Sequence, residues 1–319
     1  MSGLARRDVP SYDQLPELGT LGVRHSWGVF GDADEMGTLN FLEPSIVLSA
    51  LADARTGESI SLTLDPDVLD PPLYGRNAIR HNYLAVDRNN WDDRLDDFYP
   101  QGASQWDGLR HVRAREFGFY GGVTADPPAM GNRLGIDHWA RRGIIGRGVL
   151  LDVEAYCLAE GKSYDSHSAT SIMPELLAET ADYQRVSVGR GDLLCVRTGW
   201  TSRYRELDAD NRHAYAATPL PVFAGLFAGE SSARYLWNLQ VAAVAADNPA
   251  LEVSPGDLAI GSLHRRLIPA LGMVVGELFD FDALALRCVA EERYSFLFVS
   301  VPLNIRGGVG SPANAVAIW

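Results

Sequence analysis

Four polar side chains that can bind a small molecule and transfer protons lie in one short stretch, QGASQWDGLRH. They are Gln101, Gln105, Asp107 and His111, and all four have odd numbers. In an extended chain they would share one face, because strand side chains alternate with a period of two. In a helix they would form two i, i+4 pairs. Both conformations bring two amides, a carboxylate and an imidazole together, which indicates a reaction site. A solvated polar loop is the alternative interpretation.

A second pair of candidates lies in LHRRLIPALGMVVGEL, where His264 begins an expected helix and Glu277 lies in the strand that follows. A helix, a turn and a strand can return both side chains to the same end. Imidazole and carboxylate are ligands of divalent metals. A helix-terminal histidine and an exposed strand glutamate are the alternative. Polar residues also end three buried strands, at Asp152, Arg197 and Asp247, where α/β sheets tend to form sites.

The overall composition excludes several classes of partner. The chain has 319 residues, a net charge of -13 and 46% apolar residues, which is typical of a soluble globular protein. Such an acidic chain repels nucleic acid and anionic membranes. The first residues lack an apolar signal segment and no run of about 18 apolar residues occurs, so we expect a cytoplasmic protein. Three widely spaced cysteines in apolar contexts predict buried, inert thiols.

The elements expected to position these residues alternate between helices and buried strands, which predicts an α/β fold. Glu43-Pro44 predicts the start of a helix, and Gly143 and Gly272 predict the ends of two others. Continuous apolar stretches such as GRGVLLD, DLLCVR, VAAVAA and MVVGELF predict buried strands. No composition shift marks a boundary, so we expect a single domain over residues 1–319, with residues 1–25 as an N-terminal arm.

Residues 65–100 are acidic and aromatic and are expected to form a long loop. Loops of this length usually serve a function or bind a partner. As a free loop it would expose Trp91, Phe98 and Tyr99 to water. We therefore expect it to act as an oligomerisation arm in a homodimer or homotetramer.

Several of these stretches, in this order along the chain, resemble the metal-dependent cyclases and kynurenine-formamidase-like hydrolases. The stretches are SWGVFGDADEMGTLNFL (26–42), SQWDGLRH, FYGGV, GIDHWARRGIIGRGVLLDV (135–153), LLCVRTGW, AADNPALE, LHRRLIPALGMVVGELFDFDALA and GSPANAVAI. The resemblance implies the swivelling β/β/α fold of that family, in which helices pack around a mixed sheet, and it implies a homo-oligomer.

The family motif H-x-G-T-H-x-D-x-P-x-H coincides with the stretch from Gln101 to His111, with Ser104 in place of the threonine. In the family the first two histidines and the aspartate hold metal, and the last histidine is the acid/base. The resemblance therefore assigns Asp107 as a ligand and His111 as the catalytic proton carrier. Glutamine stands in place of both ligand histidines, Gln101 and Gln105, which is typical of a sub-branch rather than of decay.

The later histidine and glutamate of the family site match His264 and Glu277, so the implied metal ligands are Gln105, Asp107, His264 and Glu277. This oxygen-rich set suits Mn²⁺ or Mg²⁺ better than Zn²⁺. We expect a divalent metal, Mn²⁺ or Zn²⁺ with Mg²⁺ as a further candidate, in one or two copies. In a straight strand Gln101 would lie about 13 Å from Gln105, so it can reach the ion only if the chain bends. We group Gln101 with two aromatic residues, Trp27 and Trp106, as substrate-binding residues.

The implied function is hydrolysis of a small cyclic or aryl amide, a formamide resembling N-formylkynurenine, or a lactone. A metal-activated water would attack, with His111 as acid/base. The chain has no G-x-S-x-G element for a serine nucleophile, which fits this chemistry. Two alternatives remain open: a lyase, isomerase or ring-closing enzyme of secondary metabolism that uses the same site, and a catalytically inactive relative that binds a small molecule.

Overall fold

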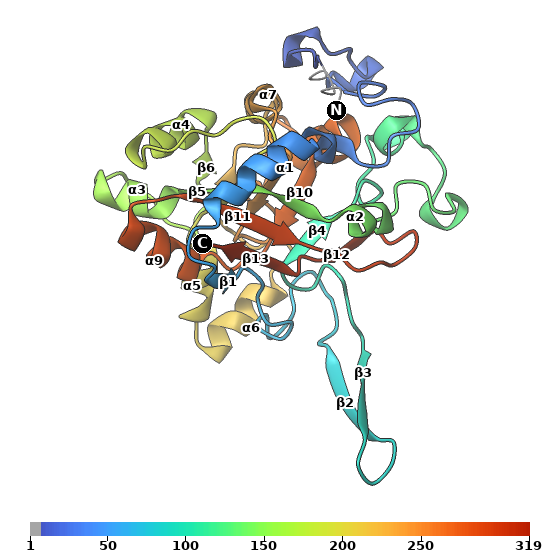
Figure 1. Ribbon diagram of the computed structural model, residues 1–319, viewed down its shortest axis with the longest axis vertical. Helices are drawn as coiled ribbons and strands as arrows, with labels where there is room; N and C mark the ends of the chain where they lie inside the picture. Colours follow the sequence, from blue (N-terminus) through green and yellow to red (C-terminus); the bar gives the residue numbers. More distant parts are fainter. Residues whose placement is uncertain (1–7) are drawn as a thin grey trace.

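A curled, mixed β-sheet organises the computed structural model, which describes residues 8–319 (Figure 1). Within those residues nine strands pair in the order β1-β13-β11-β5-β7-β9-β10-β4-β12. The strands are β1 (Ser59–Ser61), β4 (Gln105–Asp107), β5 (Ile144–Asp152), β7 (Leu193–Arg197), β9 (Ala243–Ala246), β10 (Val274–Glu277), β11 (Ser295–Ser300), β12 (Gly310–Pro312) and β13 (Ala315–Ile318).

The centre of the sheet is parallel and its flanks are antiparallel. Strands β5, β7, β9 and β10 run parallel to one another, whereas β4, β11, β12 and β13 pair antiparallel with their neighbours. Only residues 313–314 separate β12, at one edge of the sheet, from β13, which is second from the other edge. Two residues cannot span a flat sheet of this width, so the sheet must curl to bring its edges near each other.

Helices surround this sheet, as the expected alternation of helices and buried strands requires (Figure 1). They are α1 (Pro44–Ala50), α2 (Asp137–Arg142), α3 (Val153–Ala159), α4 (Pro174–Tyr183), α5 (Trp200–Arg205), α6 (Ala209–Ala217), α7 (Glu230–Leu239), α8 (Leu263–Arg265) and α9 (Asp282–Glu291). The start of α1 at Pro44 and the end of α2 at Gly143 are as predicted. The mixed sheet with helices around it confirms the predicted fold class.

The expected helix over SLHRRLIPALG has an irregular second half. Helix α8 continues directly into a π-helix, Arg266–Leu271, which contains Pro269 and ends at Gly272 as predicted. Gly272 has φ 63°, and a Cβ there would lie 2.5 Å from the Tyr120 ring, so glycine is required on both counts. Single turns of π-helix often mark functional sites.

Residues 65–100, predicted to form a long loop or an oligomerisation arm, contain regular secondary structure. A β-hairpin of β2 (Arg80–Ala85) and β3 (Trp91–Asp96) forms within this region and extends away from the body of the protein (Figure 1). The alternation of side chains along this stretch is masked by its many charged residues, which is why the strands were missed. A second small sheet pairs β6 (Ser171–Ile172) with β8 (Gly225–Leu226).

The N-terminal arm packs on the body over the part that the structure describes. Its residues 1–7 lie outside the described part of the chain. Tyr12 is fully buried, and its backbone N–H donates to the side chain of Asn238 at 2.8 Å. The indole N–H of Trp237 donates to the carbonyl of Pro10 at 2.9 Å. This segment is therefore held against α7.

All three cysteines are free and buried, as expected. Within residues 8–319, no helix combines the length and the apolar character that crossing a bilayer requires.

Candidate metal centre

Strand pairing brings two distant carboxylates together. Strands β4 and β10 are antiparallel, with Glu277 opposite Gln105 and Val275 opposite Asp107. Gln105, Asp107 and Glu277 therefore project from the same face of the sheet, since alternate residues share a face. The two acids are 170 residues apart in the chain, so only this register makes them neighbours.

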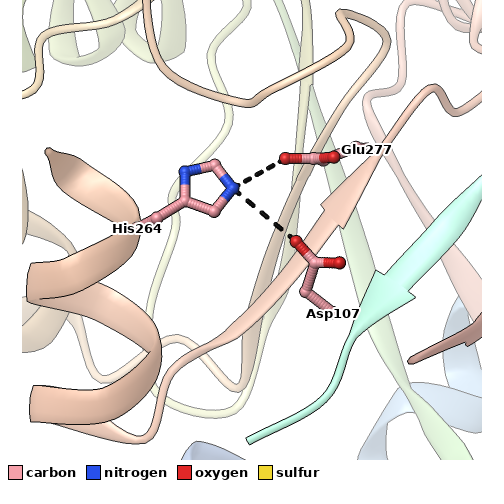
Figure 2. A group of neighbouring side chains, drawn as sticks. All are labelled: Asp107, His264 and Glu277. Atoms are coloured by element: carbon pink, nitrogen blue, oxygen red, sulfur yellow. Dashed lines mark hydrogen bonds and ion pairs between the residues drawn. The ribbon is translucent and has the colours of Figure 1, made fainter. Parts of the chain in front are cut away.

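His264 completes a compact group of three side chains that could hold a metal ion (Figure 2). Its Nε2 lies 2.8 Å from Oε1 of Glu277 and 3.6 Å from Oδ2 of Asp107. One ligand atom from each of the three residues lies within 4.8 Å of the others. His264 lies in α8, which begins after Ser262, whose hydroxyl caps the helix. The three ligand atoms therefore surround a space in which each could bind the same ion.

The site concentrates negative charge away from water. The side chains of Asp107 and Glu277 are 1% and 6% exposed. Burial raises the pKa of Glu277, and the charge of Asp107 raises it further. Burial also acts to raise the pKa of Asp107, but the charges of His111 and His264 outweigh it and lower that pKa. Burial opposes the charge of His264, yet the surrounding carboxylates raise its pKa well above the ordinary value. The site thus favours a cation.

Three buried oxygen atoms at this site have no hydrogen-bond partner among the described residues: both carboxylate oxygens of Asp107 and Oε1 of Gln105. An unsatisfied buried carboxylate is costly, so such groups are normally paired or bound to metal. Oxygen atoms of this kind suit Mn²⁺, Mg²⁺ and Zn²⁺ when imidazole completes the set. The donor set therefore fits a divalent ion.

Gln105 contacts the group through its amide nitrogen. Its Nε2 donates a short hydrogen bond to Oε2 of Glu277. With Oε2 of Glu277 bound in this way, its Oε1 faces His264. The side-chain oxygen of Gln105 has no partner among the described residues and could bind a cation. Gln105 thus lies at the predicted place, and its role as a ligand stays a prediction.

His111 lies at the edge of the group rather than inside it. Its Nε2 is 3.7 Å from Oδ1 of Asp107, and its side chain is 31% exposed. That oxygen is not the one that faces His264. His111 can therefore exchange protons with solvent or with a bound molecule while it remains next to the buried carboxylate.

Glu252 is a site residue to which the sequence analysis assigned no role. Its Oε1 lies 3.0 Å from Nδ1 of His264, and the carboxylate also accepts hydrogen bonds from the Ser262 hydroxyl and the Leu263 N–H. A carboxylate behind a metal-binding histidine fixes the tautomer and orientation of the ring. Glu252 lies 12 residues before His264, in the stretch AADNPALE that carried part of the family resemblance.

The chain bends next to Gln101, which is the condition under which this residue could approach the ion. A turn closed by the hydrogen bond from Gly102 N–H to the Tyr99 carbonyl precedes β4. The Gln101 side chain lies against Gly310, where a Cβ would come within 2.7 Å of its amide nitrogen. Gly310 is paired with Asp107. Gln101 therefore lies beside β4, the strand that carries Gln105 and Asp107. Its predicted contact with substrate stays a prediction.

The prediction that Trp106 binds substrate is wrong. Trp106 is fully buried and projects from the face of β4 opposite to Gln105 and Asp107. Its ring packs at 5.0 Å from Phe279, and its N–H donates to the Ser300 hydroxyl at 2.9 Å. A core residue with a satisfied N–H has no surface left for a ligand. The period-two alternation that groups the odd-numbered residues already separates Trp106 from them.

Trp27 lines a hollow of about 280 Å³ that is separate from the candidate metal centre. Its indole N–H donates to the carbonyl of Pro269 at 2.7 Å, toward the end of the helical segment that begins near His264. Asp34 and Tyr120 share the wall of this hollow. None of the contacts described for Trp27 reaches the three candidate metal ligands, so its predicted role in substrate binding remains a prediction.

Comparison with known proteins identifies the family. Residues 59–253 match the sequence profile of a family described as "Putative cyclase". The chain belongs to this cyclase family. A crystal structure of a novel cyclase is 28% identical, with a TM-score of 0.82, and the match covers 92% of this chain and 99% of that chain. A search of curated proteins finds no match.

Two isatin hydrolase structures share the fold of this cyclase-family chain. Isatin hydrolase A from Labrenzia aggregata bound to benzyl benzoate is 14% identical, with a TM-score of 0.59, covering 85% of this chain and 96% of that chain. An isatin hydrolase bound to the product analogue thioisatinate is 14% identical, with a TM-score of 0.60, covering 86% and 98%. The expected family resemblance and fold are thus confirmed.

Proposed function

We propose that this cyclase-family protein is a metal-dependent hydrolase of a small cyclic or aryl amide, a formamide of the N-formylkynurenine kind, or a lactone. The observation that supports it most is the buried Asp107 carboxylate. Both of its oxygens lack a hydrogen-bond partner among residues 8–319, and it lies with His264 and Glu277 in a group whose ligand atoms are within 4.8 Å of one another.

Asp107, His264 and Glu277 would hold a divalent ion, with the Gln105 oxygen at its edge. The oxygen-rich set suits Mn²⁺ or Mg²⁺, and the imidazole also makes it acceptable to Zn²⁺. When bound, such an ion polarises an acyl oxygen and lowers the pKa of a water molecule. We propose Mn²⁺ or Zn²⁺ as the resident ion, with Mg²⁺ as a third candidate, in one or two copies.

His111 would carry the proton. Its Nε2 lies 3.7 Å from Oδ1 of Asp107, at the edge of the group of candidate ligands. The oxygen of a water molecule bonds to the acyl carbon while His111 accepts the proton from that water. The C–N or C–O bond then breaks, and His111 returns the proton to the departing nitrogen or oxygen. The products are an acid and an amine or alcohol, so no covalent intermediate with the protein is required.

The shared fold with isatin hydrolases supports the choice of test substrates. Isatin is a cyclic aryl amide, so it belongs in a panel with formanilide, an aryl formamide, and dihydrocoumarin, an aryl lactone. Protein purified without chelator should contain Mn or Zn at about one ion per chain by elemental analysis. We expect turnover of at least one panel member, with loss of turnover after chelation and recovery on metal addition.

Turnover in H₂¹⁸O distinguishes hydrolysis from the alternatives. Hydrolysis places one ¹⁸O atom in the acid product, which mass spectrometry detects. A lyase, isomerase or ring-closing enzyme would add no solvent oxygen, so an unlabelled product would exclude the proposed reaction. Metal-loaded protein that binds small molecules but converts no amide, formamide or lactone, with or without a carboxylate group, would instead favour a catalytically inactive relative.

A further inference from the structure

A hollow of about 410 Å³ lies where three segments of the chain meet. Side chains from residues 61–79 and 97–104 line it, together with residues near β12. Phe98, Tyr99 and Ile79 supply apolar surface, and Arg76 supplies a positive charge. The volume lies in the range of small-molecule sites, which are mostly apolar with a few polar groups that orient the ligand.

The hollow adjoins the strand that carries the metal-ligating residues. Ser104, which lines it, immediately precedes Gln105, and its hydroxyl donates to the carbonyl of Leu278, the residue after Glu277. Pro312, also in the wall, is the pairing partner of Gln105 across β4 and β12. A molecule in the hollow would therefore lie beside the strand that carries Gln105 and Asp107.

Arg76 contributes a positive charge to this hollow that is not paired with any acid among residues 8–319. Its side chain is half-buried, and among residues 8–319 the guanidinium has no hydrogen bond and no ion pair. It lies only over the ring of Tyr74, at 5.5 Å. Of the two acids in the wall, Asp97 pairs with Arg80 at 3.0 Å and Asp65 is exposed.

No nitrogen of the Arg76 guanidinium is among the fully buried side-chain atoms, so this group is accessible to a ligand. Its planar fork matches a carboxylate through two parallel hydrogen bonds. We propose that this hollow is the substrate pocket and that Arg76 binds a carboxylate of the substrate. The substrate would then be an acyl compound with an apolar or aromatic part and an anionic group. This inference rests on the proposed hydrolase function and narrows its substrate class.

Benzoate and benzamide test this inference, because they have nearly the same size and shape and differ in charge. Isothermal titration calorimetry on the metal-loaded protein should show benzoate binding at least about tenfold more tightly than benzamide, since a hydrogen bond to a charged group has this value. Arg76→Gln should remove the preference. Arg76→Lys should keep part of it, because lysine retains the charge but not the fork.

Arg88→Gln is the matched control. Arg88 is exposed in the turn of the β2–β3 hairpin and does not line the hollow, so this substitution changes the charge equally and should leave the preference intact. A preference for benzoate that survives in Arg76→Gln would overturn the proposal, because the metal would then be the carboxylate-binding group. Failure of the parent protein to distinguish the two ligands at millimolar concentration would also overturn it.

The same titration on chelator-treated protein separates this inference from the proposed function. A preference for benzoate that depends on Arg76 in the absence of metal supports the carboxylate site by itself. The carboxylate site would be supported even if no amide or lactone were hydrolysed. That outcome would contradict only the proposed hydrolase function. Loss of the preference on chelation, with metal-dependent hydrolysis intact, would retain the hydrolase and remove the role of Arg76.

Discussion

Glu252 and His264 form a pair in which the carboxylate lies 3.0 Å from Nδ1 of the imidazole. The opposite nitrogen, Nε2, faces Glu277 and Asp107. Since Glu252 is itself held by Ser262 and the Leu263 N–H, the ring has little freedom to turn. The pair therefore presents the imidazole to the candidate metal centre in one orientation.

Removing this support should weaken metal binding without removing a ligand. We expect Glu252→Ala to lower the affinity for Mn²⁺ or Zn²⁺ by about 10–100-fold, the usual effect of losing such a partner. Glu252→Gln, which keeps an acceptor but not the charge, should lose less. Competition with a fluorescent chelator measures both. Glu160→Gln, at an exposed residue, is the control, and unchanged affinity in Glu252→Ala would contradict the positioning role.

Substitutions of Asp107 and of His111 should have different effects on metal content. His111→Ala should keep the metal and lower turnover by about 10²–10⁴-fold, the usual contribution of one acid-base group. Asp107→Ala should lose metal and activity together, because it removes a buried ligand. Elemental analysis alongside turnover measures the contrast. Loss of metal from His111→Ala, or near-normal turnover in that variant, would show that His111 is not the proton carrier.

Gln105 should influence which metal is preferred. Gln105→His replaces a neutral amide by an imidazole, and nitrogen ligands favour Zn²⁺ over Mn²⁺. We therefore expect the ratio of Zn²⁺ affinity to Mn²⁺ affinity to rise in this variant, as measured by competition between the two ions. An unchanged ratio would indicate that Gln105 acts only through its hydrogen bond to Glu277.

Asp247 should give stability a dependence on pH. Its carboxylate accepts hydrogen bonds from the N–H and hydroxyl of Thr198 and from the Gly199 N–H, at 2.6 to 2.9 Å. Burial raises its pKa to about 6, although Arg197 acts to lower it. The native state thus holds this proton more tightly than the unfolded chain does, so the stability that Asp247 contributes falls as pH rises from about 4 to about 6.

Asp247→Asn isolates that contribution. The variant should lose about 1–3 kcal/mol of unfolding free energy, because one backbone donor is left without an acceptor. The difference in urea stability between parent and variant should shrink from pH 4 to pH 6 and stay constant above. A difference that grows with pH would mean that the hydrogen bonds, rather than burial, dominate the pKa of Asp247.

The β2–β3 hairpin should mediate self-association. Tyr83, Trp91 and Leu95 share one face with His81, and they are 72%, 67% and 47% exposed. An isolated two-stranded hairpin is marginally stable, so we propose that another copy of this chain covers this face in a homodimer or homotetramer. Light scattering should give a mass of two or four times 34.8 kDa.

Tyr83→Ser combined with Trp91→Ser should shift that assembly toward the monomer while the fold of the body is kept. Val86→Ser, at an exposed residue outside that face, is the control. A parent protein that is monomeric at micromolar concentration would show that the hairpin has another role.

Local chemistry was enough to predict several elements. The start of α1 at Pro44, the end of α2 at Gly143 and the end of the His264 helix at Gly272 depend on residues at or next to those positions. Buried strands were recognisable because a strand covered on both faces is apolar throughout. The candidate chemistry of His111, Asp107, His264 and Glu277 was likewise evident from residue types and from the family resemblance.

Tertiary structure decided which of these residues meet. The register of β4 and β10 places Gln105 opposite Glu277, and strand pairing between segments 172 residues apart leaves no local signal. In the same strand the Trp106 side chain points into the core. Packing of a loop also places Glu252 next to His264. Backbone propensity and turn chemistry act over a few residues, whereas pairing register and sheet curl are set by packing of the whole chain. The sequence therefore determined the available groups, and only the folded sheet determined their assembly into a site.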